Sequence, residues 1–120
     1  MKIMIVDDSA AMRMIVKKTL RQAGFDGHEF SEAEDGAQAL AAIRAGSPDL
    51  VLSDWNMPNM SGIELLEKLA AEGVKIKFGF VTAAATDDMR TRASSAGAKF
   101  VISRPFTAET FKAALAPHIH

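Results

Sequence analysis

Cysteine, long apolar runs and an excess of one charge are all missing from this chain of 120 residues. The lack of cysteine excludes a disulfide framework, thiolate chemistry and zinc sites built on thiolates. No apolar run approaches the length of a membrane span, and Met1 and Lys2 lead into a strand-like segment rather than a signal peptide. The net charge of -1, with interspersed signs, provides no basic stripe for nucleic acid. We therefore expect one cytoplasmic domain over residues 1–120 that binds neither membrane nor nucleic acid.

Two hydrophobic periodicities alternate along the chain. Short apolar runs typical of strands lie at residues 2–6, 28–33, 50–52, 76–81 and 100–103. Helical spacing follows each run, and the expected helix N-caps include Ser9, Ser61 in a capping box with Glu64, Thr86 and Thr107. Glycines close the first three helices, and the last helix is expected to continue through Ile119. Five strands alternating with five helices predict a doubly wound α/β domain with a parallel sheet.

The segment 49–62, DLVLSDWNMPNMSG, contains the clearest indication of a functional site. Its apolar run stops shortly before Asp54, so a buried strand is expected to deliver this carboxylate to its carboxyl end. In a doubly wound sheet, ligands bind over the carboxyl ends of the strands. The residues that the other strands place there are Asp7, Asp8, Thr82 and Arg104. The sequence therefore predicts three carboxylates, a hydroxyl group and a cation in one crevice.

This set of groups is suited to phosphoryl transfer. Three carboxylates in one crevice repel one another, so either one is protonated or a hard divalent cation lies among them. Oxygen ligands without a nearby histidine favour magnesium. With the charge neutralised, Asp54 can attack a phosphoryl donor and form an aspartyl phosphate. Thr82 would then hydrogen-bond one phosphoryl oxygen, and Arg104 would pair with another.

Four short segments resemble those of response-regulator receiver domains of the CheY-like type. They are the pair Asp7–Asp8, DWNMP at residues 54–58, VTAA at 81–84 and RPF at 104–106. The resemblance covers essentially the whole chain, in family order. It implies a flavodoxin-like sheet with strand order 2-1-3-4-5.

The resemblance also implies roles for individual residues. Asp54 is expected to be the phosphoacceptor, and Mg2+ is expected to be held by Asp8 directly, by Asp7 mainly through water and by the backbone carbonyl of Asn56. Thr82 matches the switch hydroxyl that moves toward the phosphoryl group. A cis peptide bond is expected after Arg104.

The partners follow from the same resemblance. A sensor histidine kinase or a phosphotransfer protein is expected to donate the phosphoryl group, and a downstream target protein to bind the surface of helix 4, strand 5 and helix 5. The protein would catalyse its own phosphorylation and slow hydrolysis without turning over an external substrate. Chemotaxis and other signalling pathways are equally compatible with the sequence.

Two positions depart from the family pattern. Arg104 stands where the family has lysine, and it brings a planar fork in place of a point charge. Val101 stands where the family often has Tyr or Phe, and the nearby Phe100 is one residue away, which in a strand points to the opposite face. Both changes concern the expected output surface. Trp55 is expected to be partly exposed, without a chemical role.

Alternative functions can be weighed against these residues. A receiver fold that binds its partner without phosphate, with Arg104 mimicking or blocking the active state, stays open. A flavodoxin-like electron carrier is disfavoured because the first loop carries carboxylates where a flavin phosphate needs hydroxyl and amide groups. A magnesium phosphohydrolase is disfavoured because Asn56, rather than a second aspartate, follows Asp54 at the second position.

Overall fold

The fold was analysed in a computed structural model that describes residues 1–83 and 85–119. Of the VTAA segment, Ala84 lies outside the described residues. No helix in these two ranges is long and apolar enough to cross a membrane.

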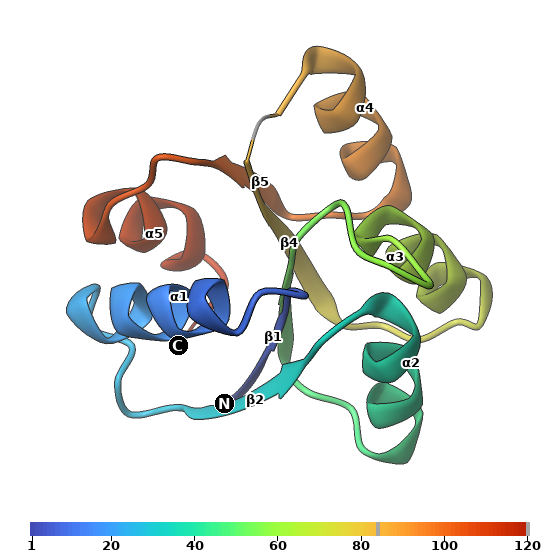
Figure 1. Cartoon of the computed structure of the whole chain (residues 1–120), viewed down its shortest axis with the longest axis horizontal. Helices are drawn as coiled ribbons and strands as arrows, with labels where there is room; N and C mark the ends of the chain where they lie inside the picture. Colours follow the sequence, from blue (N-terminus) through green and yellow to red (C-terminus); the bar gives the residue numbers. More distant parts are fainter. Residues whose placement is uncertain (84, 120) are drawn as a thin grey trace.

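A single five-stranded parallel sheet lies at the centre of the molecule (Figure 1). Its strands are β1 (Lys2–Val6), β2 (Glu29–Ala33), β3 (Leu50–Ser53), β4 (Lys77–Thr82) and β5 (Phe100–Ser103). The strand order is β2-β1-β3-β4-β5, which confirms the flavodoxin-like order. The central strand β3 is buried along its whole length, as expected for a strand covered on both faces.

Five helices connect and cover the strands. They are α1 (Ala10–Gln22), α2 (Gly36–Ala45), α3 (Gly62–Ala71), α4 (Asp87–Ala96) and α5 (Ala108–Leu115). The four predicted N-caps are confirmed, because each side chain accepts a hydrogen bond from the first helical turn. The capping box of Ser61 and Glu64 is also present.

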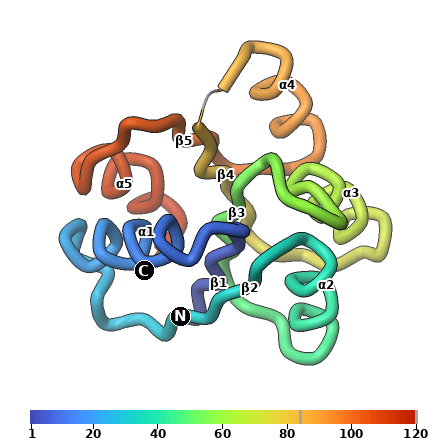
Figure 2. Tube along the Cα trace, viewed as in Figure 1, coloured from blue at the N-terminus to red at the C-terminus, as the bar shows by residue number. Residues whose placement is uncertain are grey.

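The helices form two layers, one on each face of the sheet (Figure 2). Helices α1 and α5 lie side by side on one face, where Leu20 and Phe111 are packed in a core with Ile3 and Leu52. Helices α2, α3 and α4 cover the other face, over a separate core. Two independent cores hold the carboxyl ends of the strands in a fixed arrangement.

Helices α4 and α5 were predicted from the sequence with different success. The thin apolar content after Thr86 predicts a helix that sits lightly on the sheet, and Ala93 is the one buried residue within α4. The prediction for the last helix was wrong in its length, because α5 ends at Leu115. Pro117 has no N–H to continue the helical ladder. Ile119 is nevertheless buried in the core.

The neighbours Phe100 and Val101 point to opposite faces of β5, as predicted. Phe100 packs against the core under α1 and α5, whereas Val101 packs against the other core. The Phe100 ring lies over Gly79 of β4, and a Cβ atom at Gly79 would overlap that ring. The aromatic side chain of β5 is therefore packed, partly buried, on the α1–α5 side of the sheet, and the α4 side carries valine.

Gly62 allows the β3–α3 loop to fold back against the end of β3. Its N–H donates to the Trp55 carbonyl at 2.8 Å. A Cβ atom at Gly62 would overlap the backbone carbonyl oxygen of Asp54 and would lie 2.9 Å from both Phe80 and Ser53. Only glycine fits this approach, because a backbone atom cannot move aside as a side chain can.

Gly62→Ala should therefore lower the free energy of unfolding by about 2–4 kcal/mol in urea denaturation. Gly46→Ala is the matched control, since Gly46 has extended backbone at φ -175 and open space around it. The control should change stability by no more than about 1 kcal/mol. Equal stability of the two variants would contradict the close approach at Gly62.

Candidate functional site

Three carboxylates meet at the carboxyl edge of the sheet. Asp7 and Asp8 follow β1, and Asp54 follows β3, which pairs directly with β1. One carboxylate oxygen from each residue lies within 4.8 Å of the others. Asp7 is buried, Asp54 is partly buried and Asp8 is exposed. The site is thus open on the Asp8 side and closed on the Asp7 side.

Asp54 is held by its neighbours on both sides of the carboxylate. Its Oδ1 atom accepts a hydrogen bond from the Trp55 N–H at 2.7 Å. Its Oδ2 atom lies 3.8 Å from the guanidinium Nη2 of Arg104. Burial raises the pKa of the Asp54 carboxyl, against the opposing effects of the Trp55 N–H and Arg104, and the charge of Asp8 adds to the rise.

Asp7 is fixed by backbone contacts. Its Oδ1 accepts from the Ser9 N–H at 2.9 Å, and its own N–H donates to the Ala33 carbonyl at 3.1 Å. Burial raises the pKa of the Asp7 carboxyl, and the charges of Asp54 and Asp8 raise it further, against the Ser9 hydrogen bond and Arg104. Without a cation, burial and the neighbouring carboxylates therefore disfavour ionisation of Asp7 and Asp54.

Thr82 and Arg104 end the two strands beyond β3. Thr82 is only 2 % exposed, at the end of β4. The Arg104 N–H donates to the Thr82 carbonyl at 2.9 Å, which ties the β5 end to the β4 end. The Arg104 Nε is buried and has no hydrogen-bond partner among the described residues. A buried N–H without an acceptor is unfavourable, so an acceptor that reached Nε would be stabilised.

The remaining site predictions have mixed outcomes. The cis peptide bond between Arg104 and Pro105 is confirmed. Asn56 is exposed just after Asp54, and the ligand role of its carbonyl stays a prediction. The prediction that Trp55 is partly exposed was wrong, because it is 9 % exposed and its ring lies 4.8 Å from that of Phe80. The loop turns back over the core after Asp54 and takes Trp55 with it.

The sequence did not reveal how the loop after Asp54 is held. Asn59 has a left-handed backbone, at φ 66, and its side-chain amide donates to Asp35 Oδ2 at 2.8 Å. The Gly36 N–H donates to the Met60 carbonyl at 3.1 Å. These contacts fasten the loop to the start of α2. Asparagine tolerates the left-handed conformation, so Asn59 after Pro58 was the available signal.

The donor set fits a magnesium ion. All three side chains offer hard oxygen ligands, and their spacing allows them to share one cation. Burial, with a smaller contribution from the neighbouring carboxylates, raises the pKa of Asp7 and of Asp54, and a bound cation would offset this cost of ionisation. Asp7, Asp8 and Asp54 are thus the residues that would hold the ion.

Comparison with known proteins identifies the family of this chain. The sequence profile of the response regulator receiver domain matches residues 3–116. The chain belongs to this family. It is 45 % identical over 114 residues to the chemotaxis protein CheY-3 of Vibrio cholerae, covering 93 % of this chain and 86 % of that protein. It is 43 % identical to the chemotaxis protein CheY of Pseudomonas aeruginosa, covering 93 % and 90 %.

The solved structures agree with the family assignment. The structure of the chemotaxis response regulator CheY4 of Vibrio cholerae superimposes with a TM-score of 0.84 at 29 % identity, covering 98 % of each chain. The chain is thus a CheY-like receiver. Its role is that of a response regulator in two-component signalling, and receivers of this family generally bind Mg2+ and interact with kinases and targets.

Asp7→Asn should stabilise the metal-free protein at neutral pH. An acid whose pKa is raised by folding binds protons more tightly in the folded state, so its contribution to stability falls as pH rises from the ordinary aspartate range through the raised value. The amide oxygen of asparagine can still accept from Ser9. We expect a melting temperature about 2–6 °C higher at pH 7, the shift that about 1 kcal/mol produces in a domain of this size.

The same variant provides its own control. The difference from the wild type should shrink at acid pH, where Asp7 is protonated in both states. Saturating Mg2+ should raise the melting temperature of the wild type more than that of the variant. A variant that is less stable than the wild type at pH 7 without metal would contradict a raised pKa of Asp7 in the folded state.

Proposed function

We propose that this receiver is a phosphorylation-controlled switch, in which Asp54 accepts a phosphoryl group from a histidine kinase or phosphotransfer protein in the presence of Mg2+. One observation carries the proposal. The Asp54 carboxylate lies within 4.8 Å of two further carboxylates and 3.8 Å from the Arg104 guanidinium. Such a pairing of a cation-binding cluster with a fixed positive charge is what an incoming phosphoryl group requires.

The transfer itself is a substitution at phosphorus. Asp54 Oδ2 is the proposed nucleophile, because Oδ1 is engaged by the Trp55 N–H. The new bond joins this oxygen to phosphorus, the P–N bond to the donor histidine breaks, and its electron pair returns to the imidazole nitrogen. A bound Mg2+ would neutralise the negative charge that otherwise builds up between the carboxylates and the phosphoryl oxygens. Later attack by water on phosphorus would release phosphate and regenerate Asp54.

Thr82 and Arg104 would carry the signal away from Asp54. The hydroxyl of Thr82 is buried at the end of β4, and the Arg104 N–H is bonded to the carbonyl of the same threonine. A movement of either residue toward the phosphoryl group would pull on the ends of β4 and β5. The surface of α4, β5 and α5 is therefore the proposed binding site for a downstream target protein. The light packing of α4, with Ala93 as its one buried residue, supports this role.

The phosphoacceptor can be tested directly by intact-mass measurement. Incubation with a small phosphodonor and Mg2+ should add one phosphate to the wild type, and Asp54→Asn should abolish the addition. Asp26→Asn, at an exposed loop position, should be modified as the wild type is. An unmodified wild type would favour the phosphate-independent interaction module instead.

The Arg104 fork should matter for how firmly a phosphoryl group is held. Its Nη2 lies near Asp54 and its Nε has no acceptor among the described residues, so two N–H groups are available where lysine offers one head. Arg104→Lys should weaken binding of the phosphoryl analogue beryllofluoride by about 3–10-fold, and Arg104→Met by more. The measurement is a titration in saturating Mg2+. If the wild type and Arg104→Lys bind beryllofluoride with equal affinity, the guanidinium group contributes no more than an ammonium group.

A further inference from the structure

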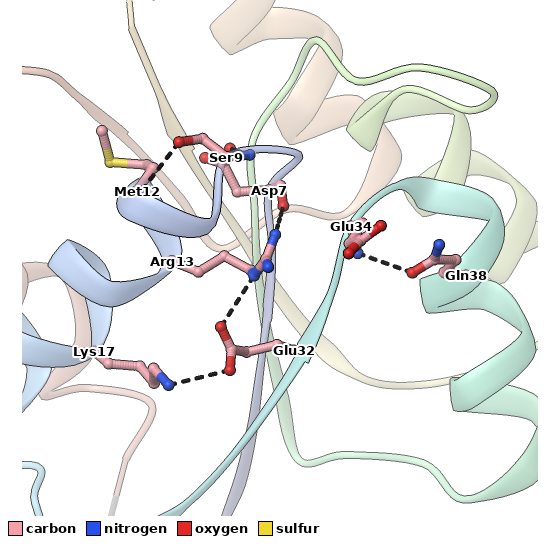
Figure 3. Close-up of polar contacts among 8 residues, drawn as sticks. All are labelled: Asp7, Ser9, Met12, Arg13, Lys17, Glu32, Glu34 and Gln38. Atoms are coloured by element: carbon pink, nitrogen blue, oxygen red, sulfur yellow. Dashed lines mark hydrogen bonds and ion pairs between the residues drawn. The ribbon is translucent and has the colours of Figure 1, made fainter.

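Arg13 in the second turn of α1 contacts the metal-binding loop without contributing a ligand. Its Nη1 donates a hydrogen bond to the backbone carbonyl of Asp7 at 2.7 Å (Figure 3). Its side chain is 12 % exposed, so the contact is largely shielded from water. Asp7 is thereby held at its N–H, its carboxylate and its carbonyl. The partners of the N–H and of the carboxylate are backbone groups. The partner of the carbonyl is the Arg13 side chain, which a mutation can change.

The guanidinium of Arg13 is itself held by a carboxylate on β2. Its Nε donates to Glu32 Oε1 at 3.0 Å, while Lys17 Nζ donates to Glu32 Oε2 at 3.1 Å (Figure 3). Hydrogen bonds from Lys17 and Arg13 lower the pKa of Glu32, so Glu32 remains ionised at neutral pH. Glu32 thus fixes the direction in which the Arg13 fork points.

The Asp7 carbonyl belongs to the peptide unit that leads to Asp8. A peptide unit is planar, so fixing the direction of its carbonyl also fixes the N–H and the Cα atom of the next residue. Asp8 is exposed and carries the carboxylate on the open side of the site. The hydrogen bond from Arg13 therefore helps to place the Asp8 Cα atom, from which the carboxylate extends.

We infer that Arg13 is a positioning residue, which orients the Asp7–Asp8 peptide so that Asp7 and Asp8 can share one divalent cation with Asp54. Glu32 holds Arg13 in place, and Lys17 supports Glu32 without reaching the loop. The inference rests on the cation site of the proposed function. It adds that cation binding at this site depends on Glu32 of β2, the strand at one edge of the sheet, because Glu32 holds Arg13.

Electrostatics alone would have the opposite effect. Arg13 and Lys17 are both cations close to an acidic site, so removing either one should favour binding of a second cation. If Arg13 acts by position, its removal should instead weaken binding. The two residues share Glu32 as partner and differ in the contact with Asp7, which makes Lys17 the matched control.

The test is a Mg2+ titration of the full chain, followed by the fluorescence of Trp55, the single tryptophan, next to Asp54. Arg13→Met should raise the dissociation constant on the order of 10-fold, as removal of other residues that orient metal ligands does. Arg13→Lys should also weaken binding, because a single ammonium group cannot serve both acceptors as the fork does. Lys17→Met should bind as tightly as the wild type or more tightly.

A structural readout separates positioning from general destabilisation. The NMR amide signal of Asp8 should move in both Arg13 variants and stay unchanged in Lys17→Met, in samples without metal. Wild-type affinity in Arg13→Met, or equal weakening in Lys17→Met, would overturn the inference and leave the proposed function standing. A wild type that binds no Mg2+ would overturn it as well. Tight Mg2+ binding without any phosphorylation of Asp54 would overturn the proposed function alone.

Discussion

The burial of carboxylates close together at one edge of the sheet is the constraint on which the site depends. Oxygen atoms of Asp7, Asp8 and Asp54 lie within 4.8 Å of one another, and burial raises the pKa of two of the three acids. Folding therefore assembles a cluster that opposes its own ionisation. The two hydrophobic cores supply the stability that tolerates this cluster, and a cation or a proton relieves it.

The loops that carry the acids are fastened from several directions. Gly62 brings the loop after β3 against the Asp54 carbonyl, and Asn59 ties the same loop to Asp35, the N-cap of α2. Arg13 holds the loop after β1 and is itself held from β2. Each anchor comes from a different element, so the geometry of the carboxylates depends on the whole domain. Helix α4 is packed more lightly, with Ala93 as its one buried residue, which supports its proposed part in binding a target protein.

Much of the fold could be predicted because its signals are local. Alternating periodicities locate the strands and helices, and N-cap residues such as Ser61 and Thr107 mark helix starts by hydrogen bonds that span only one turn. Two features could not be predicted because distant segments decide them. Trp55 is buried because the loop packs it on Phe80, and Arg13 looks like an ordinary surface cation until β2 is placed beside β1.

By itself, the sequence determined the order of elements and the residue types at the strand ends, and with them the acidic character of the site. Alternation of strands and helices leaves the strand order open, and only the family resemblance suggested it. The meeting of Asp54 with Asp7 and Asp8 was predicted and is present. Tertiary structure alone decided that Phe100 covers Gly79 and that Glu32 reaches Arg13. The physical reason is that local propensity acts over a few residues, whereas these contacts depend on which strands pair and which loops fold back across them.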